Sequence, residues 1–449
     1  MKKNIFESFC ARSIVAFSLC TYFVLSSIMF GLPSLASESL AVAPMWFDKH
    51  LLVLAVPGAS ESDIRSAIGK DGRIVKTSRL QQLTIYKVFY ESGSAMGAAE
   101  LSMKRNPRVL AVQKNLISNS EFHSTAAGPM PETRPMLDTD RNINDPYFSR
   151  QVELSELHVP SAWRRVANPA SNTIALVSTG AWANNPESNQ QGFYDAVSMR
   201  EGTASDLLNR GSLLGAIAAA KTNNSVGIAS PARYSMLLPI NVTAGYSYPL
   251  GSNRNGIADD SLIEAVSYCA RPGRNGRPQA PIVLLDSVFD PQYALHDSSL
   301  HPVLHMVLRW FHDSQGGIVV CPYGANTRSS QSQPLPYLNV VGNLNAHYDS
   351  IISFTMPGSG ALSADRFGNP VRILGSGASA ALFAGLAGLV WSANPSYSNL
   401  QVERALASSC TKTIAGVNSG SAAIPPGGLP MRRLPGFGMP DAALALGVR

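Results

Sequence analysis

A short turn that leads into a helix of small residues is the first place where this sequence suggests chemistry. The segment "LGSGASAALFAGLAGLVWSANPS", which starts at Leu374, puts the turn Gly375-Ser376-Gly377 before a helix rich in Ala and Gly. A strand, a tight turn and a helix N-terminus together are a common mount for a nucleophilic side chain. Gly377, in the middle of the turn, has no side chain, so the turn resembles a reactive site without a reactive atom.

Three other segments have the same character. The sequence "STG" at 178–180 follows an apolar run, "RGS" at 210–212 opens the run "LLGAIAAA", and "GGIVVCPYGAN" is an apolar run that ends at Asn326. The carboxyl ends of parallel strands meet at one edge of a sheet, where sites of α/β proteins lie. These segments are therefore expected to surround one site.

Taken in order, the four segments resemble the subtilase family, the subtilisin-like serine proteases. In that family the first strand ends in Asp-Thr-Gly, a His-Gly-Thr turn opens a buried helix, the oxyanion strand ends in Ala-Gly-Asn, and the nucleophile turn reads Gly-Thr-Ser-x-Ala. The resemblance runs from residue 144 to about residue 446 and includes the loop "NNSVGIAS" and the closing segment "GFGMPDAALAL". It implies a subtilisin-like α/β fold, with a doubly wound and mostly parallel sheet.

The resemblance matches Ser178, Arg210 and Gly377 to the aspartate, histidine and serine of the family's catalytic triad. That mechanism needs a hydroxyl that attacks the carbonyl, an imidazole that takes its proton, and a carboxylate that orients the imidazole. Gly377 has no hydroxyl, Arg210 stays protonated at any working pH, and Ser178 carries no charge. No histidine lies between residues 159 and 295, so a small shift of the alignment supplies no base. The triad is therefore predicted to be substituted.

The resemblance also implies residues that would bind a substrate. Asn326 matches the family's oxyanion asparagine, and without a nucleophile it either holds its loop or binds a carbonyl. Ser287, Val288 and Phe289 match the strand along which the family binds its peptide substrates. Phe289 stands where the family has glycine, which puts peptide binding in the usual register in doubt.

Other reactive groups have simpler interpretations. Ser376 and Ser379 flank the turn and are interpreted as turn and N-cap residues. His301, His305 and His312 have the helical spacings of four and seven around the helix expected at 302–311, and His296 lies just before them. They lack the glutamate of an HExxH zinc motif, so solvated or core histidines are expected and no metal or cofactor is.

The cysteines leave two alternatives open. Cys269, Cys321 and Cys410 remain once an N-terminal leader is removed, and no CxxC motif occurs. An odd number of cysteines allows one disulfide with a free thiol, or three buried thiols.

The elements that must position the site alternate between strand and helix. Short β-branched runs predict buried strands, and Ala-rich amphipathic runs predict helices. The strands are expected at 173–177, 236–240, 282–285, 318–321 and 338–341, and the helices at 213–220, 259–269, 302–311, 378–392 and 398–408. This alternation predicts a parallel sheet covered by helices on both faces.

A smaller domain is expected before this sheet, at residues 48–117. Strands at 51–56, 74–80, 83–90 and 109–113 and helices at 61–69 and 95–105 give the order βαββαβ of a ferredoxin-like α+β domain. Next to a subtilase this domain looks like the family's inhibitory propeptide. Residues 118–143 hold three prolines and few large apolar residues and predict an exposed linker, which leaves 144–449 as the peptidase-like domain.

The N-terminus reads as a targeting segment. Three basic residues in the first twelve precede an apolar run at 14–30, and Ser34-Leu35-Ala36 suits a signal peptidase that cuts after Ala36. A signal peptide at 1–36 implies a secreted or periplasmic protein. A permanent membrane anchor remains the alternative, because the apolar run is nearly long enough to span a bilayer.

Composition narrows the choice of partners. The formal charge of the 449 residues is +6, of which the first twelve residues supply +2, and no basic run is interleaved with aromatic residues. Nucleic acid is therefore a poor candidate partner. We expect a pseudoprotease that keeps its propeptide-like domain and binds a protein or peptide in the former cleft, or regulates an active relative. The alternative is an active or residual serine endopeptidase.

Overall fold

The structure is a computed structural model. It describes residues 46–119, 142–206, 208–247, 253–273, 276–286, 295–323, 334–344, 349–358, 360–415, 431–433 and 435–447. The expected signal peptide lies outside these residues, and so do Asn326, Ser287, Val288 and Phe289. The predictions made for them stay predictions.

An eight-stranded sheet forms the centre of the larger domain, in the order β14-β13-β12-β11-β5-β8-β6-β7. Its strands are β5 (Thr173–Ser178), β6 (Tyr194–Asp195), β7 (Arg200–Glu201), β8 (Met236–Asn241), β11 (Ile282–Leu285), β12 (Ile318–Pro322), β13 (Asn339–Asn343) and β14 (Phe354–Met356). All neighbouring pairs are parallel except β6 with β7. The five expected strands are confirmed, and the parallel sheet with them.

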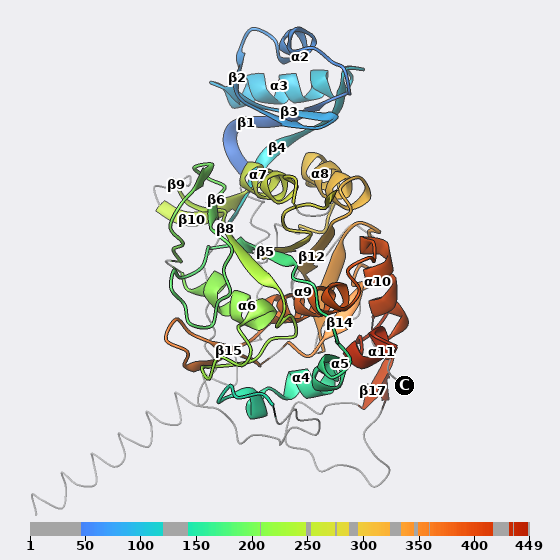
Figure 1. The fold of residues 1–449 in the computed structure, drawn as a ribbon. Helices are drawn as coiled ribbons and strands as arrows, with labels where there is room; N and C mark the ends of the chain where they lie inside the picture. The colour runs from blue at the N-terminus through green and yellow to red at the C-terminus, as the bar shows by residue number, and fades with distance from the viewer. Residues whose placement is uncertain are drawn as a thin grey trace, which may run out of the picture. The chain divides into compact units, whose positions relative to one another are not determined.

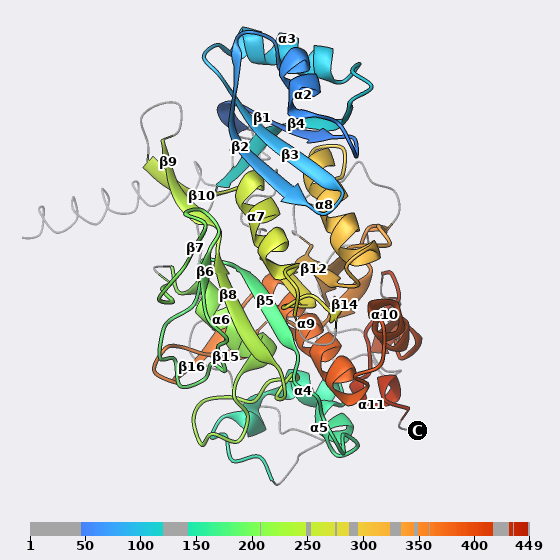
Figure 2. The same cartoon turned by 45° about the horizontal axis from the view of Figure 1, so that its top comes forward.

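Helices cover both faces of this sheet (Figures 1 and 2). Along β5, Ile174 and Leu176 pack with α6 (Arg210–Ala219) and α9 (Ser376–Ala393), whereas Ala175 and Val177 pack with α7 (Asp259–Cys269) and α8 (Pro302–Asp313). Every residue of β5 is buried. The alternation of side chains along a strand thus divides the core into two layers, as the sequence predicted.

The remaining elements are short. They are η1 (Phe148–Arg150), α4 (Val152–Glu156), α5 (Val159–Trp163), β15 (Ala361–Ala364), β16 (Pro370–Ile373), α10 (Asn399–Ser408), β17 (Thr413–Ala415), β18 (Met431–Arg433) and α11 (Ala442–Ala445). Among the described residues, only α9 is long and apolar enough to cross a membrane by length and composition, and 94% of it is buried inside the protein. It packs as a core helix because its Ala and Gly residues admit close neighbours.

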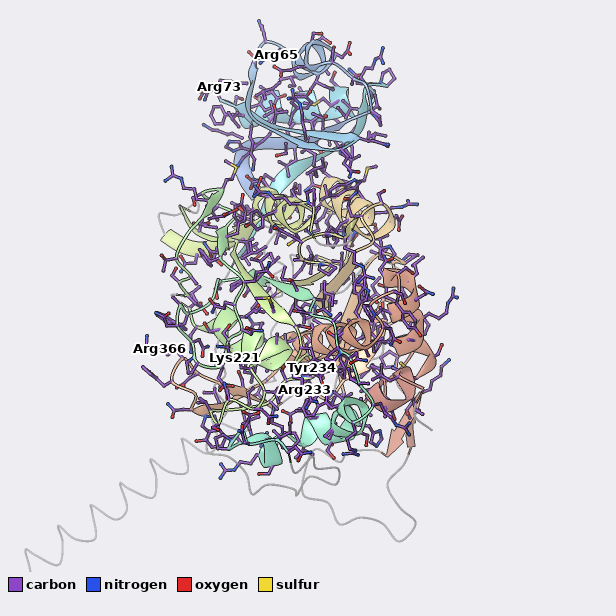
Figure 3. The ribbon with its side chains drawn as sticks, viewed as in Figure 1. Arg65, Arg73, Lys221, Arg233, Tyr234 and Arg366 are labelled. Atoms are coloured by element: carbon purple, nitrogen blue, oxygen red, sulfur yellow. The ribbon has the colours of Figure 1, made fainter. Side chains whose placement is uncertain are left out.

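The N-terminal part has the expected βαββαβ order. Its elements are β1 (Trp46–Ala55), α2 (Glu61–Ile68), β2 (Gly72–Leu80), β3 (Leu83–Tyr90), α3 (Gly93–Met103) and β4 (Val109–Asn119). The strands pair antiparallel in the order β2-β3-β1-β4 of a ferredoxin-like sheet. Figure 3 labels Arg65 of α2, which pairs with Glu61 one turn earlier at 2.7 Å, and Arg73 of β2.

One boundary of the sequence prediction is wrong. The strand expected at 109–113 continues to Asn119, so residues 118 and 119 do not belong to a linker. The end of β4 pairs antiparallel with β10 (Asn253–Ala258), with Ile117 opposite Ala258, and β10 pairs with β9 (Thr243–Ser247). The extra residues form a strand because their main-chain groups find partners on β10, which the local sequence cannot reveal.

Both faces of the N-terminal sheet are apolar. Leu51, Val53 and Ala55 of β1 belong to a core with α2 and α3, and the alternate residues Leu52 and Leu54 belong to the core that contains α7 and α8. The second face is therefore buried against the larger domain.

Polar contacts surround this apolar contact. Lys76 Nζ lies 2.9 Å from Glu264 Oε2, and Lys87 Nζ lies 2.6 Å from Asp260 Oδ2. The Gln113 side chain donates to Asp259 Oδ2 at 2.6 Å and accepts from the main-chain N–H of Val303 at 2.6 Å. Gln113 of β4 thereby joins the N-terminal ends of α7 and α8.

Candidate functional site

The three residues matched to the triad come together around a fourth residue, Asp286. Ser178 is the last residue of β5, and Asp286 directly follows β11, which is the parallel neighbour of β5. Arg210 is the first residue of α6, and Gly377 is the second residue of α9. The carboxyl ends of two adjacent strands and the N-terminal ends of two helices thus define one site, as expected for this class of sheet.

Asp286 accepts hydrogen bonds from two of these residues. Arg210 Nε donates to Oδ2 at 2.8 Å and Arg210 Nη2 donates to Oδ1 at 2.7 Å. Ser178 Oγ donates to Oδ2 at 2.8 Å. The Asp286 side chain is fully buried and that of Arg210 is 22% exposed. This is a bidentate arginine–carboxylate pair, the geometry in which a guanidinium binds a carboxylate most strongly.

Because Gly377 has no side chain, the Arg210–Asp286 pair can occupy the space beside it. A Cβ atom at residue 377 would lie 2.6 Å from Arg210 Nη2 and 3.4 Å from Asp286 Oδ1. The guanidinium therefore lies where a side chain at 377 would project. A serine here and the observed Arg210 conformation exclude each other.

A second buried carboxylate holds the start of α6. Asp206 Oδ1 accepts from Thr179 Oγ1 at 2.7 Å, and its Oδ2 accepts from the main-chain N–H of Ser212 at 2.7 Å. Thr179 Oγ1 also accepts from the N–H of Gly211 at 2.9 Å. Burial raises the pKa of Asp206, although these hydrogen bonds act in the opposite direction. The first turn of α6, which carries Arg210, is thereby fixed to the end of β5.

Two serines, Ser376 and Ser379, lie beside Gly377 in the first turn of α9. Ser379 is fully buried, and its Oγ donates to the carbonyl of Met356 at 3.4 Å. The N-cap of α9 is Gly375, and Ser376 is the first helical residue, so the N-cap role expected of the serines is wrong. Glycine occupies the cap because its φ of 99° lies in the left-handed region.

The four clustered histidines are buried, and three of them have polar partners inside the chain, whereas His296 Nε2 has no hydrogen-bond partner among the described residues. His301 Nδ1 lies 3.0 Å from Asp259 Oδ2, His305 lies between the Leu295 carbonyl and the Tyr337 hydroxyl, and His312 contacts both Asp313 and Glu403. Burial lowers the pKa of His305 to about 3 and that of His296 to about 4. In the ranges that the structure covers, no three His, Cys, Asp or Glu side chains form a group that could hold a metal ion.

Of the two cysteine alternatives, the structure has three thiols. Cys269 and Cys321 are buried and Cys410 is partly buried, and none is in a disulfide. Burial raises the pKa of all three thiols, that of Cys410 to about 12. They are therefore poor nucleophiles.

Sequence reasoning missed Asp286. The sequence analysis assigned residues 287–289 to the substrate-binding strand and gave no role to Asp286, the last residue of "IVLLD". The available signal was Arg210 itself, because a fixed charge at the start of an apolar helix requires a counter-ion when it is buried. Arg210 Nε and Nη2 both bind Asp286, so this carboxylate is the counter-ion of Arg210 inside the chain.

Comparison with known proteins agrees with the fold. No family model matches the chain. The chain is 26% identical over 271 residues to thermitase of Thermoactinomyces vulgaris, which covers 58% of this chain and 88% of thermitase. It is 28% identical over 221 residues to the thermophilic serine proteinase of Bacillus sp. (strain AK1), covering 48% of this chain and 49% of that proteinase.

Among solved structures, the chain resembles fervidolysin from Fervidobacterium pennivorans, a keratinolytic enzyme related to subtilisin. The TM-score is 0.63 at 14% sequence identity, and the likeness covers 90% of this chain and 61% of fervidolysin. The class of protein that the fold defines is thus subtilisin-like. The two sequence relatives, both serine peptidases by name or kind, support the resemblance of this chain to the subtilase family.

Proposed function

We propose that this chain is a catalytically inactive subtilase that is exported and acts by binding or regulating another protein. The observation that carries the proposal is the contact of Arg210 with Asp286 in the space beside Gly377. Subtilase chemistry requires a hydroxyl and a neutral base in that space. A guanidinium bound to a carboxylate supplies neither, and Ser178 uses its hydroxyl on the same carboxylate.

The second candidate is a serine endopeptidase with full or residual activity. It is favoured by the relatives, since thermitase and the thermophilic serine proteinase are peptidases by name. A nucleophile would then have to come from Ser376 or Ser379. Within the described part of the chain, neither hydroxyl hydrogen-bonds a histidine.

We expect the purified protein neither to cleave casein nor to react with a fluorophosphonate probe. In subtilisin, loss of the triad lowers turnover by about 10⁶-fold, so activity should lie below detection. Gel fluorescence after boiling measures labelling, and an active subtilisin labelled in parallel is the positive control. A covalent label that maps to Ser376 or Ser379 would establish the endopeptidase and refute the inactive assignment.

The N-terminal domain is proposed to remain attached, because a chain without a triad cannot cut itself. The pairing of β4 with β10, the contacts of Lys76 and Lys87 with α7, and the apolar second face of the sheet all support a lasting association. A tether also keeps the local concentration of the domain high, in the mM range for a flexible linker.

The mass of the secreted protein is expected to correspond to a chain that starts near residue 37. Expression in a host that lacks extracellular proteases leaves self-cutting as the only route to a shorter form. Intact-mass spectrometry of the medium or periplasm measures the start. A dominant species that begins near residue 144 in this host would contradict the proposal and support the serine endopeptidase instead.

Two modes of action then remain to be distinguished. In one, the former cleft and the N-terminal domain form a binding surface for a protein partner, and in the other they regulate an active subtilase. A pull-down from the native secretome with the full secreted chain tests both. Recovery of an active subtilase supports regulation, and recovery of a protein without peptidase activity supports a scaffold.

A further inference from the structure

The six-stranded sheet that joins the N-terminal domain to the larger domain has two edge strands, β2 and β9. An edge strand presents main-chain N–H and C=O groups on its outer side, and these groups pair readily with a strand of another chain. Proteins protect such edges with charged residues, with bulges, with very short strands or with a covering segment. The edge strands of this molecule differ in how far they are protected.

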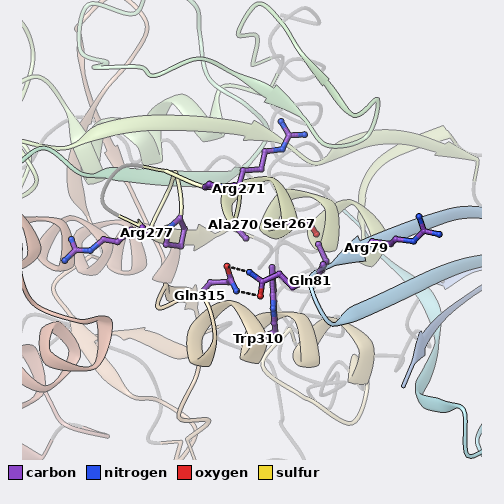
Figure 4. Close-up of a pocket in the computed structure, with 12 residues that line it drawn as sticks. Arg79, Gln81, Ser267, Ala270, Arg271, Arg277, Trp310 and Gln315 are labelled. Atoms are coloured by element: carbon purple, nitrogen blue, oxygen red, sulfur yellow. Dashed lines mark hydrogen bonds between the residues drawn. The ribbon is translucent and has the colours of Figure 1, made fainter. Parts of the chain in front are cut away.

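The edge at β2 is well protected. Its pairing with β3 shifts register within the strand, and three of its nine residues are basic: Arg73, Lys76 and Arg79. The turn after β2 is fixed to the residues after α8, because the Gln81 and Gln315 side chains exchange hydrogen bonds of 2.9 and 3.3 Å (Figure 4). An irregular strand with three like charges is poorly suited to pair with its own copy.

The edges of the eight-stranded sheet are short or occupied. β7 has two residues, and β14 has three. The outer side of β14 is covered, since the main-chain N–H of Thr355 donates to the Gly438 carbonyl at 2.9 Å and that of Phe437 donates to the Ser353 carbonyl at 2.8 Å. Neither edge offers a free strand of useful length.

The edge at β9 has none of these protections. Its five residues include no charged residue and no proline, and its pairing with β10 keeps one register throughout. Apart from this pairing, residues 244–247 form no main-chain hydrogen bond with any part of the chain that the structure describes. Gly245 is exposed, and a Cβ atom there would meet nothing within 4 Å. Figures 1 and 2 show β9 outside β10, at the margin of the molecule.

The inner side of the same hairpin already binds a strand. Residues 256–258 of β10 pair antiparallel with the end of β4, which comes from the N-terminal domain. This hairpin thus joins two parts of the molecule by main-chain pairing. The outer side of β9 presents the same chemistry to a further strand.

We propose that β9 pairs with β9 of a second copy of this chain. A two-fold axis makes the two strands antiparallel, and full overlap puts Gly245 opposite the partner's Gly245. Because β9 has no charged side chain, no like charges meet in this arrangement. The protected β2 strands then form both ends of the joined sheet, so assembly stops at two copies instead of growing into a fibre. This inference goes beyond the proposed function and does not depend on whether the chain is a peptidase.

The dimer is expected to be weak, because the pairing of two five-residue strands buries less surface than the interface of a stable dimer. We expect sedimentation velocity with the full secreted chain to give a Kd of about 100 µM, with mostly monomer at about 5 µM and mostly dimer at about 500 µM. The main-chain amides of residues 243–247 should exchange with deuterium more slowly at the higher concentration. A chain that stays monomeric at about 500 µM would overturn the proposal.

Charges introduced at residue 245 test whether the association uses β9. Gly245→Lys and Gly245→Glu each put like charges opposite each other across the two-fold axis, and each is expected to weaken self-association by at least about 5-fold. An equal mixture of the two variants pairs unlike charges and should restore association to the level of the wild type. Gly202→Lys is the control, because Gly202 is also exposed with open space at its Cβ but follows β7, and it should leave the Kd unchanged.

Equal unfolding midpoints at about 5 µM establish that the variants fold. Association that is unchanged in both Gly245 variants, weakened equally by Gly202→Lys, or not restored in the mixture would overturn the pairing of β9. Slower exchange at β2 in place of β9 would assign the association to the other edge and would also overturn it.

Discussion

Replacing Arg210 by methionine is expected to lower the free energy of unfolding by about 3 kcal/mol, because the buried Asp286 carboxylate would lose its counter-ion. Removing one partner of a buried pair leaves the other charge desolvated, and Ser178 alone cannot compensate for it. Urea unfolding followed by circular dichroism measures the change. The variant also tests whether Arg210 stabilises the fold or serves a partner, since a residue kept for a partner could be replaced at little cost.

The double variant Arg210→Met/Asp286→Leu should recover most of that loss, because it removes both charges and fills the space with apolar groups. A residual loss of about 1 kcal/mol is expected from the Ser178 hydroxyl, which would have lost its acceptor. Arg309→Met is the control, since the Arg309–Asp313 pair is exposed and should be worth less than about 0.5 kcal/mol. If Arg210→Met changes stability no more than Arg309→Met does, the structural role of Arg210 is wrong.

Acid is expected to destabilise the protein through its buried histidines. Burial holds the pKa of His305 at about 3 in the folded state, whereas an unfolded histidine has a pKa near 6.5. The unfolded state therefore binds the proton first, and stability is lost as the pH falls from 6.5 toward 3. His305 alone should account for about 3 kcal/mol between pH 6.5 and pH 4, and His296 acts in the same direction.

Two buried glutamates oppose this trend. Burial raises the pKa of Glu153 and of Glu187 to about 7, above the unfolded value, so their contribution to stability rises as the pH falls from 7 to 4.5. The effect of His305 is therefore measured as the difference between His305→Gln and the wild type, in urea unfolding at a series of pH values. The free energy of unfolding of His305→Gln minus that of the wild type is expected to rise by about 3 kcal/mol as the pH falls from 6.5 to 4.

His312→Gln is the matched control. Burial would lower the pKa of His312, but hydrogen bonds to Glu403 and Asp313 outweigh it and raise the pKa above 6.5. Its contribution is complete below pH 6.5 and is lost only as the pH rises through the higher folded pKa. His312→Gln should thus leave the curve unchanged from pH 4 to 6.5. A curve for His305→Gln parallel to that of the wild type would refute the assignment.

Much of the fold could be predicted from the sequence because it follows from local pattern. The strand 282–285 and the helix 259–269 begin and end where expected, since β-branched runs and amphipathic spacing are properties of the segments themselves. The end of β4 was underestimated because its last residues are held by β10, more than a hundred residues later. Pairing at that separation leaves no mark in the local sequence.

The candidate site could likewise be predicted from the sequence only in part. That Gly377 lacks a nucleophile and that Arg210 cannot be a base are statements about residue types, and the sequence contains them. That Asp286 accepts from both Arg210 and Ser178 depends on side-chain directions at the ends of two strands and the start of a helix. Arg210 lies 76 positions before Asp286 in the sequence, and Ser178 lies 108 positions before it. These residues meet only in the folded chain, so their contact could not be predicted from the sequence.

The overlap between a Cβ at residue 377 and the Arg210 guanidinium limits which single substitutions the site can accept. A serine at 377 would require the end of the Arg210 side chain to shift, which would disturb its two hydrogen bonds to Asp286. A histidine at 210 would likewise remove the guanidinium that now binds Asp286. If the centre is inactive as we propose, each of these single substitutions would disturb the Arg210–Asp286 pair before it could contribute to catalysis, so a working triad would require several substitutions at once.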